Sequence, residues 1–292
     1  MPKQPGDRLF AIVNATVLSL VGLCALFPLY YVFVVSFTDP VEYVSRGFVL
    51  FPEKWSLLSY RYLLSTKLFI SAISVSGFLA IVGTVLSLIV TSMFAYTLSR
   101  KRFMGKKGLL LLVLLTTLFS PGIIPNYLLV REMGLINSIW SLIIPSLTSG
   151  WYVLLMKGFY DSLPEGLEEA ATIDGCNDVQ IWIRIMLPLS LPAMAAFGLF
   201  YAVGYWNTFF NAILYINKPD LWPLQVVLRN MLIDASTSAG GTVAQELVGD
   251  IQMPSETLKM AAVVIATVPI VAVYPFLQKH FAKGAMVGSV KG

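Results

Sequence analysis

Aromatic and amide side chains gather in one otherwise apolar stretch of the chain, and these are the residue types that bind sugars. The members of this aromatic–amide stripe are Tyr201, Tyr205, Trp206, Asn207, Asn211 and Tyr215. Aromatic rings pack against the C–H faces of a sugar, and amides pair with its hydroxyl groups. Tyrosine and tryptophan also anchor helices at the membrane boundary, and this alternative stays open above all for Tyr215. We expect the other five members of the stripe, Tyr201, Tyr205, Trp206, Asn207 and Asn211, to line the path of a sugar.

A polar stretch near the middle of the chain, Glu169-Ala-Ala-Thr-Ile-Asp-Gly175, has the residue types of a docking surface. Its carboxylates, together with Glu168, offer acceptors to a basic partner. Its small alanines allow another surface to approach the backbone closely, and its glycine permits a sharp turn. A solvated amphipathic loop is the alternative interpretation. The expected contact residues are Glu169, Ala170, Ala171, Asp174 and Gly175.

The residue patterns of an enzyme are missing from the sequence. There is no phosphate loop of the form G-x-x-x-x-G-K-[ST], and His280 is the only histidine, which argues against a histidine-based catalytic set or metal cluster. The long apolar runs carry no charge, so the buried ion sites and proton relays of many secondary transporters are absent as well. We therefore expect this chain to be no enzyme and to bind no cofactor, and if transport needs energy, we expect a partner to supply it.

The composition indicates lipid as the solvent. Of the 292 residues, 57% are apolar and 12% are charged, with a mean hydropathy of +0.76. Soluble domains carry about 25% charged residues. The net charge of +4 is too small to indicate nucleic acid as a partner, and it suits cytoplasmic loops that face anionic lipid. Cys24 and Cys176 are not expected to form a disulfide.

Six uncharged runs are long enough to cross a bilayer, which takes about 20 apolar residues. The sequence therefore predicts an all-α integral membrane protein with six transmembrane helices. The expected helices cover residues 9–37, 69–99, 108–130, 139–156, 189–215 and 258–277. The third is expected to be interrupted near Ser120-Pro-Gly122. External segments are expected at residues 38–66 and 217–256, and the second begins with a short amphipathic helix.

The distribution of lysine and arginine places both ends of the chain in the cytoplasm, because cytoplasmic segments are enriched in these residues. With that orientation the most compact basic cluster, within residues 100–107, lies inside. The first apolar run is too long for a signal-peptide core, and we expect it to be retained. The polar stretch around Glu169 is then cytoplasmic.

Residues 161–187 are expected to form a helical hairpin between the fourth and fifth transmembrane helices. Gly175 suits the left-handed residue that ends a first helix. Asn177 or its successor caps a second helix, from about residue 179 to 186. Pro188 is expected to discourage the continuation of that helix.

The hairpin resembles the EAA loop of ATP-binding-cassette (ABC) importer permeases. The match comprises Glu169-Ala-Ala171, three residues to Gly175 and nine more to Ile185-Met-Leu-Pro188, and it precedes the penultimate expected helix as in that family. Trp206-Asn207 with Phe209 resembles the W-N-x-F pattern of the carbohydrate branch, although Thr208 stands where many relatives have an acidic residue. The tail Gly288-Ser-Val-Lys-Gly292 resembles that of the maltose-type second permease.

The resemblance implies a cytoplasmic coupling-helix hairpin that sits in a cleft of an ATPase subunit. The implied partners are a homologous second permease in a heterodimer, two ATP-binding subunits that use ATP and Mg²⁺, an extracytoplasmic solute-binding protein and the sugar. The implied location is the bacterial inner membrane, which the chain crosses several times. The branch includes the second permease of alginate importers, so an alginate-type oligosaccharide is a candidate substrate. A permease for a non-sugar solute and a secondary transporter are the alternatives.

Overall fold

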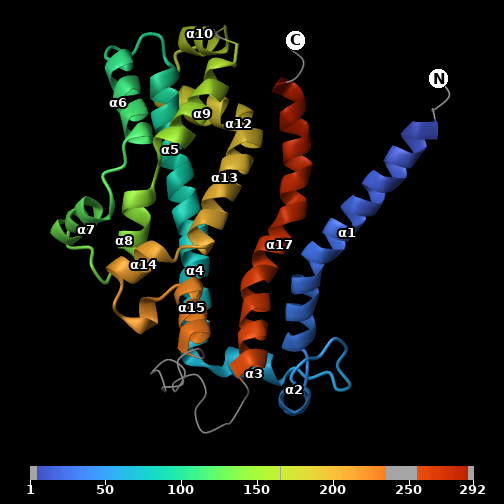
Figure 1. The fold of residues 1–292 in the computed structure, drawn as a ribbon. Coiled ribbons are helices and arrows are strands. Elements are labelled where there is room, and N and C mark those ends of the chain that lie inside the picture. Colours follow the sequence, from blue (N-terminus) through green and yellow to red (C-terminus); the bar gives the residue numbers. More distant parts are fainter. Residues whose placement is uncertain (1–4, 165, 235–254, 289–292) are drawn as a thin grey trace. The chain divides into compact units, whose positions relative to one another are not determined.

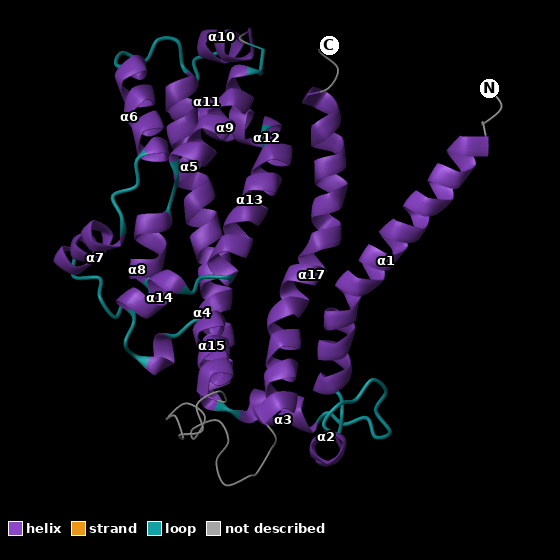
Figure 2. Ribbon diagram, viewed as in Figure 1, coloured by secondary structure: helices purple, strands orange, loops and turns teal. Residues whose placement is uncertain are grey.

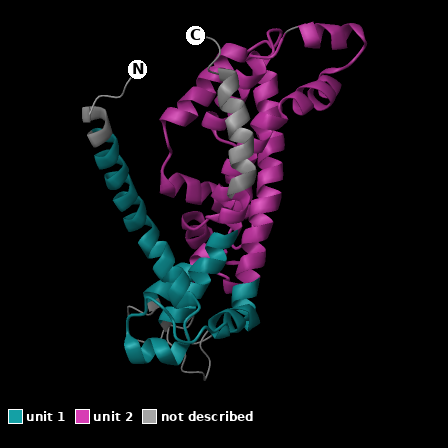
Figure 3. Ribbon diagram, turned by 90° about the vertical axis from the view of Figure 1, so that its right-hand side faces the viewer, with its two compact units in different colours: residues 1–70, 228–268 teal, residues 71–227, 269–292 magenta. Residues whose placement is uncertain are grey.

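The described part of the chain is helical. The computed structural model describes residues 5–164, 166–234 and 255–288, and within them the regular elements are helices (Figures 1 and 2). Extended pairing in these residues is limited to an isolated bridge between Thr38 and Trp55. The chain divides into two compact units, residues 1–70 with 228–268 and residues 71–227 with 269–292 (Figure 3). The predicted all-α fold class is confirmed.

Three of the described helices are long and apolar enough to cross a membrane without a break: Phe10–Ser36, Lys67–Ser99 and Glu256–Val273. Three further pairs pass the same test only as bent units. They are Lys106–Leu118 with Ile123–Glu132, Trp140–Ser146 with Gly150–Asp161, and Asp178–Leu189 with Leu191–Trp206, bent by 118°, 51° and 83°. The described residues therefore hold three to six spans by length and composition, and the six-span topology stays a prediction.

The first unit carries a tightly tied segment between its helices α1 (Pro5–Ser36), α2 (Pro40–Arg46) and α3 (Leu58–Ser65). Asp39 caps α2 by accepting from the Val41 amide at 2.9 Å. The Glu42 carboxylate accepts from the backbone N–H groups of Glu53 and Lys54, each at 3.0 Å. It also pairs with Arg46 at 2.9 Å. One carboxylate thus ties residues 53–54 to α2, in the first part of the predicted external segment 38–66.

This carboxylate makes the segment sensitive to acid. The backbone hydrogen bonds from Glu53 and Lys54 hold the pKa of Glu42 below its usual value. A depressed pKa stabilises the fold above the unfolded value, near 4.3 for glutamate, and the contribution is lost as pH falls through the folded pKa. We therefore expect amide exchange at Glu53 and Lys54, corrected for intrinsic rates, to lose protection below about pH 4.

Hydrogen–deuterium exchange at neutral and acid pH measures this directly. Glu42→Gln should abolish the pH dependence, because the amide does not titrate. Glu53→Gln is the matched control, since the Glu53 carboxylate is 74% exposed and, among the described residues, pairs with Arg46 alone. Equal protection of the wild-type amides at both pH values would show that the Glu42 contacts do not hold this segment.

The second unit is built on one long span. Its first part is α4 (Lys67–Phe78), the π-helical turn η1 (Leu79–Gly83) and α5 (Thr84–Ser99). The following elements are α6 (Lys106–Leu118), α7 (Ile123–Glu132), α8 (Trp140–Ile143), η2 (Ile144–Ser146), α9 (Gly150–Asp161), α10 (Gly166–Ile173), α11 (Asp178–Ile181), η3 (Trp182–Met186), α12 (Leu187–Leu189), α13 (Leu191–Trp206), α14 (Phe210–Tyr215), η4 (Pro219–Leu221), α15 (Leu224–Asp234) and α17 (Ser255–Gly288). Helices α9 and α13 pack against α5. Helices α4, α15 and α17 each contain residues of both units.

Some of the expected elements fall on residues that are not described. Residues 235–254 of the predicted external segment 217–256 lie outside the described residues, as do the last four residues of the tail. The amphipathic helix expected at the start of that segment is α15. The expected interruption of the third helix separates α6 from α7, where Gly122 has a φ of 86°.

Two helices that were expected to be continuous are divided, so these predictions were wrong in part. The stretch 139–156 breaks between η2 and α9, because Pro145 lacks a backbone N–H donor. Ser149 is extended, and its side chain caps α9 by accepting from the Tyr152 backbone N–H. The stretch 189–215 breaks after Trp206, where Asn207 leaves the helical conformation as the C-cap of α13.

Helix α12 ends at Leu189 and the chain bends by 83° before α13, so the second helix of the hairpin stops close to Pro188, as expected. The chain passes through Pro188 from η3 into α12, and the turn ends at Ser190. A proline in an α-helix clashes with the carbonyl four residues earlier, and the wider π-turn over residues 182–186 precedes the proline at that distance. Local propensity did not reveal this accommodation.

A glycine fixes how closely α13 approaches the long span. A Cβ atom at Gly83 would lie 2.7 Å from ring carbons of Tyr205, whereas one at Gly77 would meet nothing within 4 Å. Both glycines are helical, so alanine brings the same gain in helix propensity at either site. We expect Gly83→Ala to lower the free energy of unfolding by about 1–3 kcal/mol relative to Gly77→Ala, as overpacking does. Thermal unfolding in detergent measures the difference, and equal midpoints would contradict the contact.

Candidate functional site

The polar stretch forms a short helical hairpin with local signals at its turn. Helix α10 ends at Ile173, and Gly175 has a φ of 82°, the left-handed conformation that glycine adopts most easily. Asn177 then caps α11 in a reciprocal capping box. The backbone N–H of Gln180 donates to the Asn177 side-chain oxygen, and the backbone N–H of Asn177 donates to the Gln180 side-chain oxygen, each at 2.9 Å.

The inner face of the hairpin is part of the core of the second unit. Ala171 and Ile181 are buried, one from each arm, and pack in a cluster with Met156 and Tyr160 of α9. Met186 continues this cluster beyond the second arm. Small Ala171 therefore serves close packing against the chain's own helices. The apolar cluster fixes the hairpin to α9.

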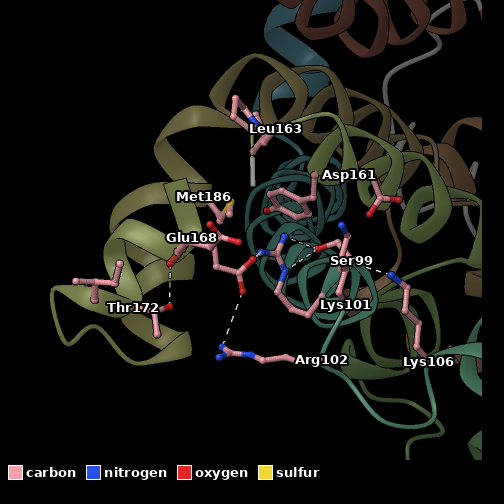
Figure 4. Close-up of a pocket in the computed structure, with 14 residues that line it drawn as sticks. Ser99, Lys101, Arg102, Lys106, Asp161, Leu163, Glu168, Thr172 and Met186 are labelled. Carbon is pink, nitrogen blue, oxygen red and sulfur yellow. Dashed lines mark hydrogen bonds and ion pairs between the residues drawn. The ribbon is translucent and has the colours of Figure 1, made fainter. Parts of the chain in front are cut away.

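Ion pairs join the hairpin to the end of α5 (Figure 4). Glu168 of α10 pairs with Arg100, and Asp178 of α11 pairs with Arg102. Arg102 also lies 3.9 Å from Glu168. Burial lowers the pKa of the Arg100 guanidinium, and the nearby Tyr96 and Asp161 oppose that shift. Of the acceptors proposed for a partner, Glu168 is thus already occupied within the chain.

The outer face of the hairpin is exposed. Ile173 is 86% exposed and Val179 is 60% exposed. Glu169, Ala170 and Asp174 are exposed as well. Glu169 makes no hydrogen bond or ion pair with the residues that the structure describes. This face combines apolar side chains with free carboxylate, which is the composition of a docking surface for a protein with basic and apolar groups.

A cavity of about 840 Å³ lies between the hairpin and the α5–α6 loop. Its lining includes Arg100, Arg102 and Lys106 on the loop side and Glu168 and Glu169 on the hairpin side. The Lys106 ammonium donates to the Ser99 carbonyl at 3.2 Å. The charges of both signs face one another here, so the cavity belongs to the contact between loop and hairpin. Within the described residues no cluster of side chains could hold a metal ion.

Three of the five expected substrate-path residues line a second cavity. The volume of this cavity is about 320 Å³, and its wall includes Tyr201, Tyr205 and Asn211 together with Phe209 and Phe210. The tyrosine hydroxyls are bound to α5: Tyr201 to Thr91 at 2.7 Å and Tyr205 to Ser87 at 2.9 Å. These hydroxyls hold α13 on α5, and the rings supply the cavity surface.

Trp206 and Asn207 are not among the residues that line this cavity. Asn207 lies at the end of α13, where its amide nitrogen donates to the Val203 carbonyl at 2.9 Å. Its amide oxygen accepts from Gln225 at 3.0 Å. Tyr215 is buried and stacks with Tyr127 at a ring distance of 6.3 Å.

Sequence reasoning missed the roles of Arg100, Arg102, Glu168 and Asp178 as a connected set. The basic cluster within residues 100–107 was visible, but it was assigned only to membrane orientation. The carboxylates lie far along the chain from the arginines, and no local spacing relates them. Gln225, which holds Asn207, likewise carries no local signal.

The comparisons place the whole chain in one family. The family model described as "Binding-protein-dependent transport system inner membrane component" matches residues 2–287. The chain is 44% identical to the polygalacturonan/rhamnogalacturonan transport system permease protein YtcP of Bacillus subtilis (strain 168), over 98% of this chain and 99% of that protein. It is also 44% identical to the protein LplC of the same organism, over 100% and 98%.

A solved structure is similar along almost the full length. It is a chain from the crystal structure of a bacterial ABC transporter involved in the import of the acidic polysaccharide alginate. The TM-score is 0.88 at 31% sequence identity, with 96% of this chain and 99% of that chain covered. The similarity therefore extends from the hairpin through the helices on both sides of it.

Proposed function

The chain belongs to the family of inner membrane components of binding-protein-dependent transport systems, and from this premise we propose that it carries an oligosaccharide through the membrane in an ABC importer. The chain itself is a non-catalytic permease subunit. Its implied partners are a homologous second permease, two cytoplasmic ATPase subunits and an extracytoplasmic solute-binding protein. ATP and Mg²⁺ act in the ATPase subunits, and no cofactor is assigned to this chain.

The observation that carries this proposal is the two-sided hairpin. Its inner face, with Ala171 and Ile181, is built into the helix packing of the second unit. Its outer face, with Ile173 and Glu169, is exposed. A rigid element that is fixed on one side and free on the other can pass a push from a partner to the membrane helices. In this proposal the ATPase subunit receives Glu169, Ala170, Asp174 and Gly175, while Ala171 holds the inner packing.

The orientation follows from the same assignment. The hairpin and both ends of the chain lie in the cytoplasm, and segments 38–66 and 217–256 face the binding protein. The basic residues of the α5–α6 loop are then cytoplasmic, as membrane topology favours. Six spans result when each bent pair is counted as one crossing.

The proposed substrate is an acidic oligosaccharide built from uronic acids. The names of the relative at 44% identity and of the structure at TM-score 0.88 refer to polygalacturonan and to alginate, and both polymers carry a carboxylate on the sugar ring. The described residues that line the second cavity are uncharged. Aromatic rings and the Asn211 amide suit the sugar faces and hydroxyls, so selection for the carboxylate falls to the binding protein.

The coupling role is tested at the turn of the hairpin. Gly175 has a φ of 82°, a conformation that costs an L-residue roughly 1–2 kcal/mol and that β-branched residues resist most. Gly175→Val should lower the fraction of permease that co-purifies with tagged ATPase subunit by about tenfold, the equivalent of 1.4 kcal/mol. Gly175→Asn is the matched control, because asparagine tolerates this conformation. Wild-type co-purification of a well-expressed valine variant would speak against the hairpin as the docking element.

The substrate class is tested with defined sugars. Proteoliposomes that contain the assembled importer and its cognate binding protein should take up trigalacturonate or an alginate trimer at least about tenfold faster than maltotriose, a neutral trisaccharide of the same length. Uptake should require ATP in the vesicle lumen, on the side of the membrane where the ATPase subunits lie. Preference for maltotriose would replace the acidic class by a neutral one, and uptake without ATP would favour a secondary transporter.

A further inference from the structure

Two arginines on one short strip of backbone hold the two arms of the hairpin separately. Arg100 is the C-cap residue of α5, with an extended backbone at ψ 130°. Arg100 and Arg102 stand two residues apart in the α5–α6 loop. Arg100 pairs with Glu168 of the first arm, and Arg102 pairs with Asp178 of the second. The loop therefore ties both arms to the same end of α5.

Arg100 is built into the end of α5. Its Nε and Nη2 donate to the Ser99 hydroxyl at 3.0 and 2.8 Å, which leaves Nη1 for Glu168. Its guanidinium lies over the Tyr96 ring, 4.5 Å from the ring centre. The side chain is 10% exposed. A planar fork with several donors can bind the hydroxyl, the ring and the carboxylate together, whereas a lysine ammonium could not match this geometry.

Arg102 forms the outer half of the arrangement. Its side chain is 54% exposed and that of Asp178 is 59% exposed. Exposed ion pairs contribute little to the stability of a fold. Their geometry can still fix the orientation of a docked element. A substitution that places like charges at Arg102 and Asp178 would push the loop and the hairpin arm apart. This exposed pair can therefore be reversed without opening the core.

The first half of α5 contacts the tyrosines that line the second cavity. Thr91 and Ser87 of α5 bind the hydroxyls of Tyr201 and Tyr205. A displacement of the end of α5 is transmitted along an unbroken helix to these two contacts. A continuous chain of packed and hydrogen-bonded groups thus runs from Glu168 through Arg100 and α5 to the tyrosines.

We propose that Arg100 and Arg102 are positioning residues that clamp both arms of the hairpin to α5, so that movement of the hairpin moves α5 and the tyrosine wall of the second cavity. This inference rests on the proposed function, in which an ATPase subunit moves the hairpin. It adds an internal link that the docking surface alone does not provide. Glu168 belongs to this link, and Glu169 remains for the partner.

The test uses the purified importer and a reporter in the second cavity. A single cysteine replaces Asn211, which lines that cavity, in a background in which Cys24 and Cys176 are alanine. Its labelling rate by a maleimide is measured without nucleotide and with ATP and vanadate, so no sugar is needed. The variants are Arg102→Glu, Asp178→Arg and the double charge swap. Lys107→Glu is the matched control, since it reverses an exposed charge in the first turn of α6, next to the same loop, and Lys107 has no ion pair with the described residues.

Both single reversals should reduce the ATP-dependent change in labelling rate roughly fivefold or more, the lower end of coupling between sites. Co-purification of the ATPase subunit should stay at the wild-type level, which a folding defect would not allow. The double swap should restore most of the change, and Lys107→Glu should retain it. Arg100→Lys, which keeps the charge and loses the fork, should fall between the wild type and the single reversals.

Two results would overturn the clamp: a wild-type labelling change in both single reversals, or a double swap no better than either of them. A wild-type complex that assembles and hydrolyses ATP without any labelling change would overturn the proposed function, and the clamp with it. The first two results leave the proposed function intact, so the two failures are distinguishable.

Discussion

The constraint on which this structure depends is that backbone polar groups in a bilayer must find partners within the protein. Helices meet it automatically, but the second unit interrupts its helices at several points. At several of these points a nearby group of the protein supplies a hydrogen-bond partner. Ser149 caps α9, the Tyr205 hydroxyl reaches the Ser146 carbonyl at 3.3 Å, and the amide of Asn137 donates to the Tyr215 carbonyl at 2.8 Å. These contacts hold the chain near residues 146–149 and at residue 215, whereas residues 119–122 between α6 and α7 are exposed.

As a consequence, one continuous helix supports helices that are divided. The span from α4 to α5 contains no proline and runs unbroken through the π-turn at η1, so it provides a straight support. The divided elements α8–α9 and α13–α14 pack against it or near it. Hydroxyl pairs such as Thr91 with Tyr201 fix the register of these helix contacts. Lipid tails offer no hydrogen bonds that would compete with such pairs. A glycine at position 83 lets Tyr205 approach closely enough for its own hydroxyl pair.

The features that could be predicted from the sequence are those with a local physical cause. Uncharged runs predict an all-helical membrane protein, a left-handed glycine predicts the turn at Gly175, and Asn177 predicts a helix start. The helix breaks were predicted less well. Pro145 and Pro188 each lie just before a bend of the chain, of 51° and 83°, yet a π-turn precedes Pro188 and an α-helical turn precedes Pro145. That outcome depends on which neighbours can satisfy the freed carbonyls, and local propensity does not contain this information.

The carboxylate pair Glu168 and Glu169 shows the same limit at the candidate site. The two residues are identical in type and adjacent, so sequence alone offers both to a partner. Both line the cavity beside the arginine loop, but the rotation of about 100° between consecutive helical residues brings only Glu168 to a described arginine. Desolvation decides the rest: a half-buried Glu168 without Arg100 would leave a costly unpaired charge, whereas an exposed Glu169 stays hydrated until a partner replaces the water. A carboxylate already paired within the chain can orient the hairpin, and in the proposed complex the unpaired one is available to an ATPase subunit.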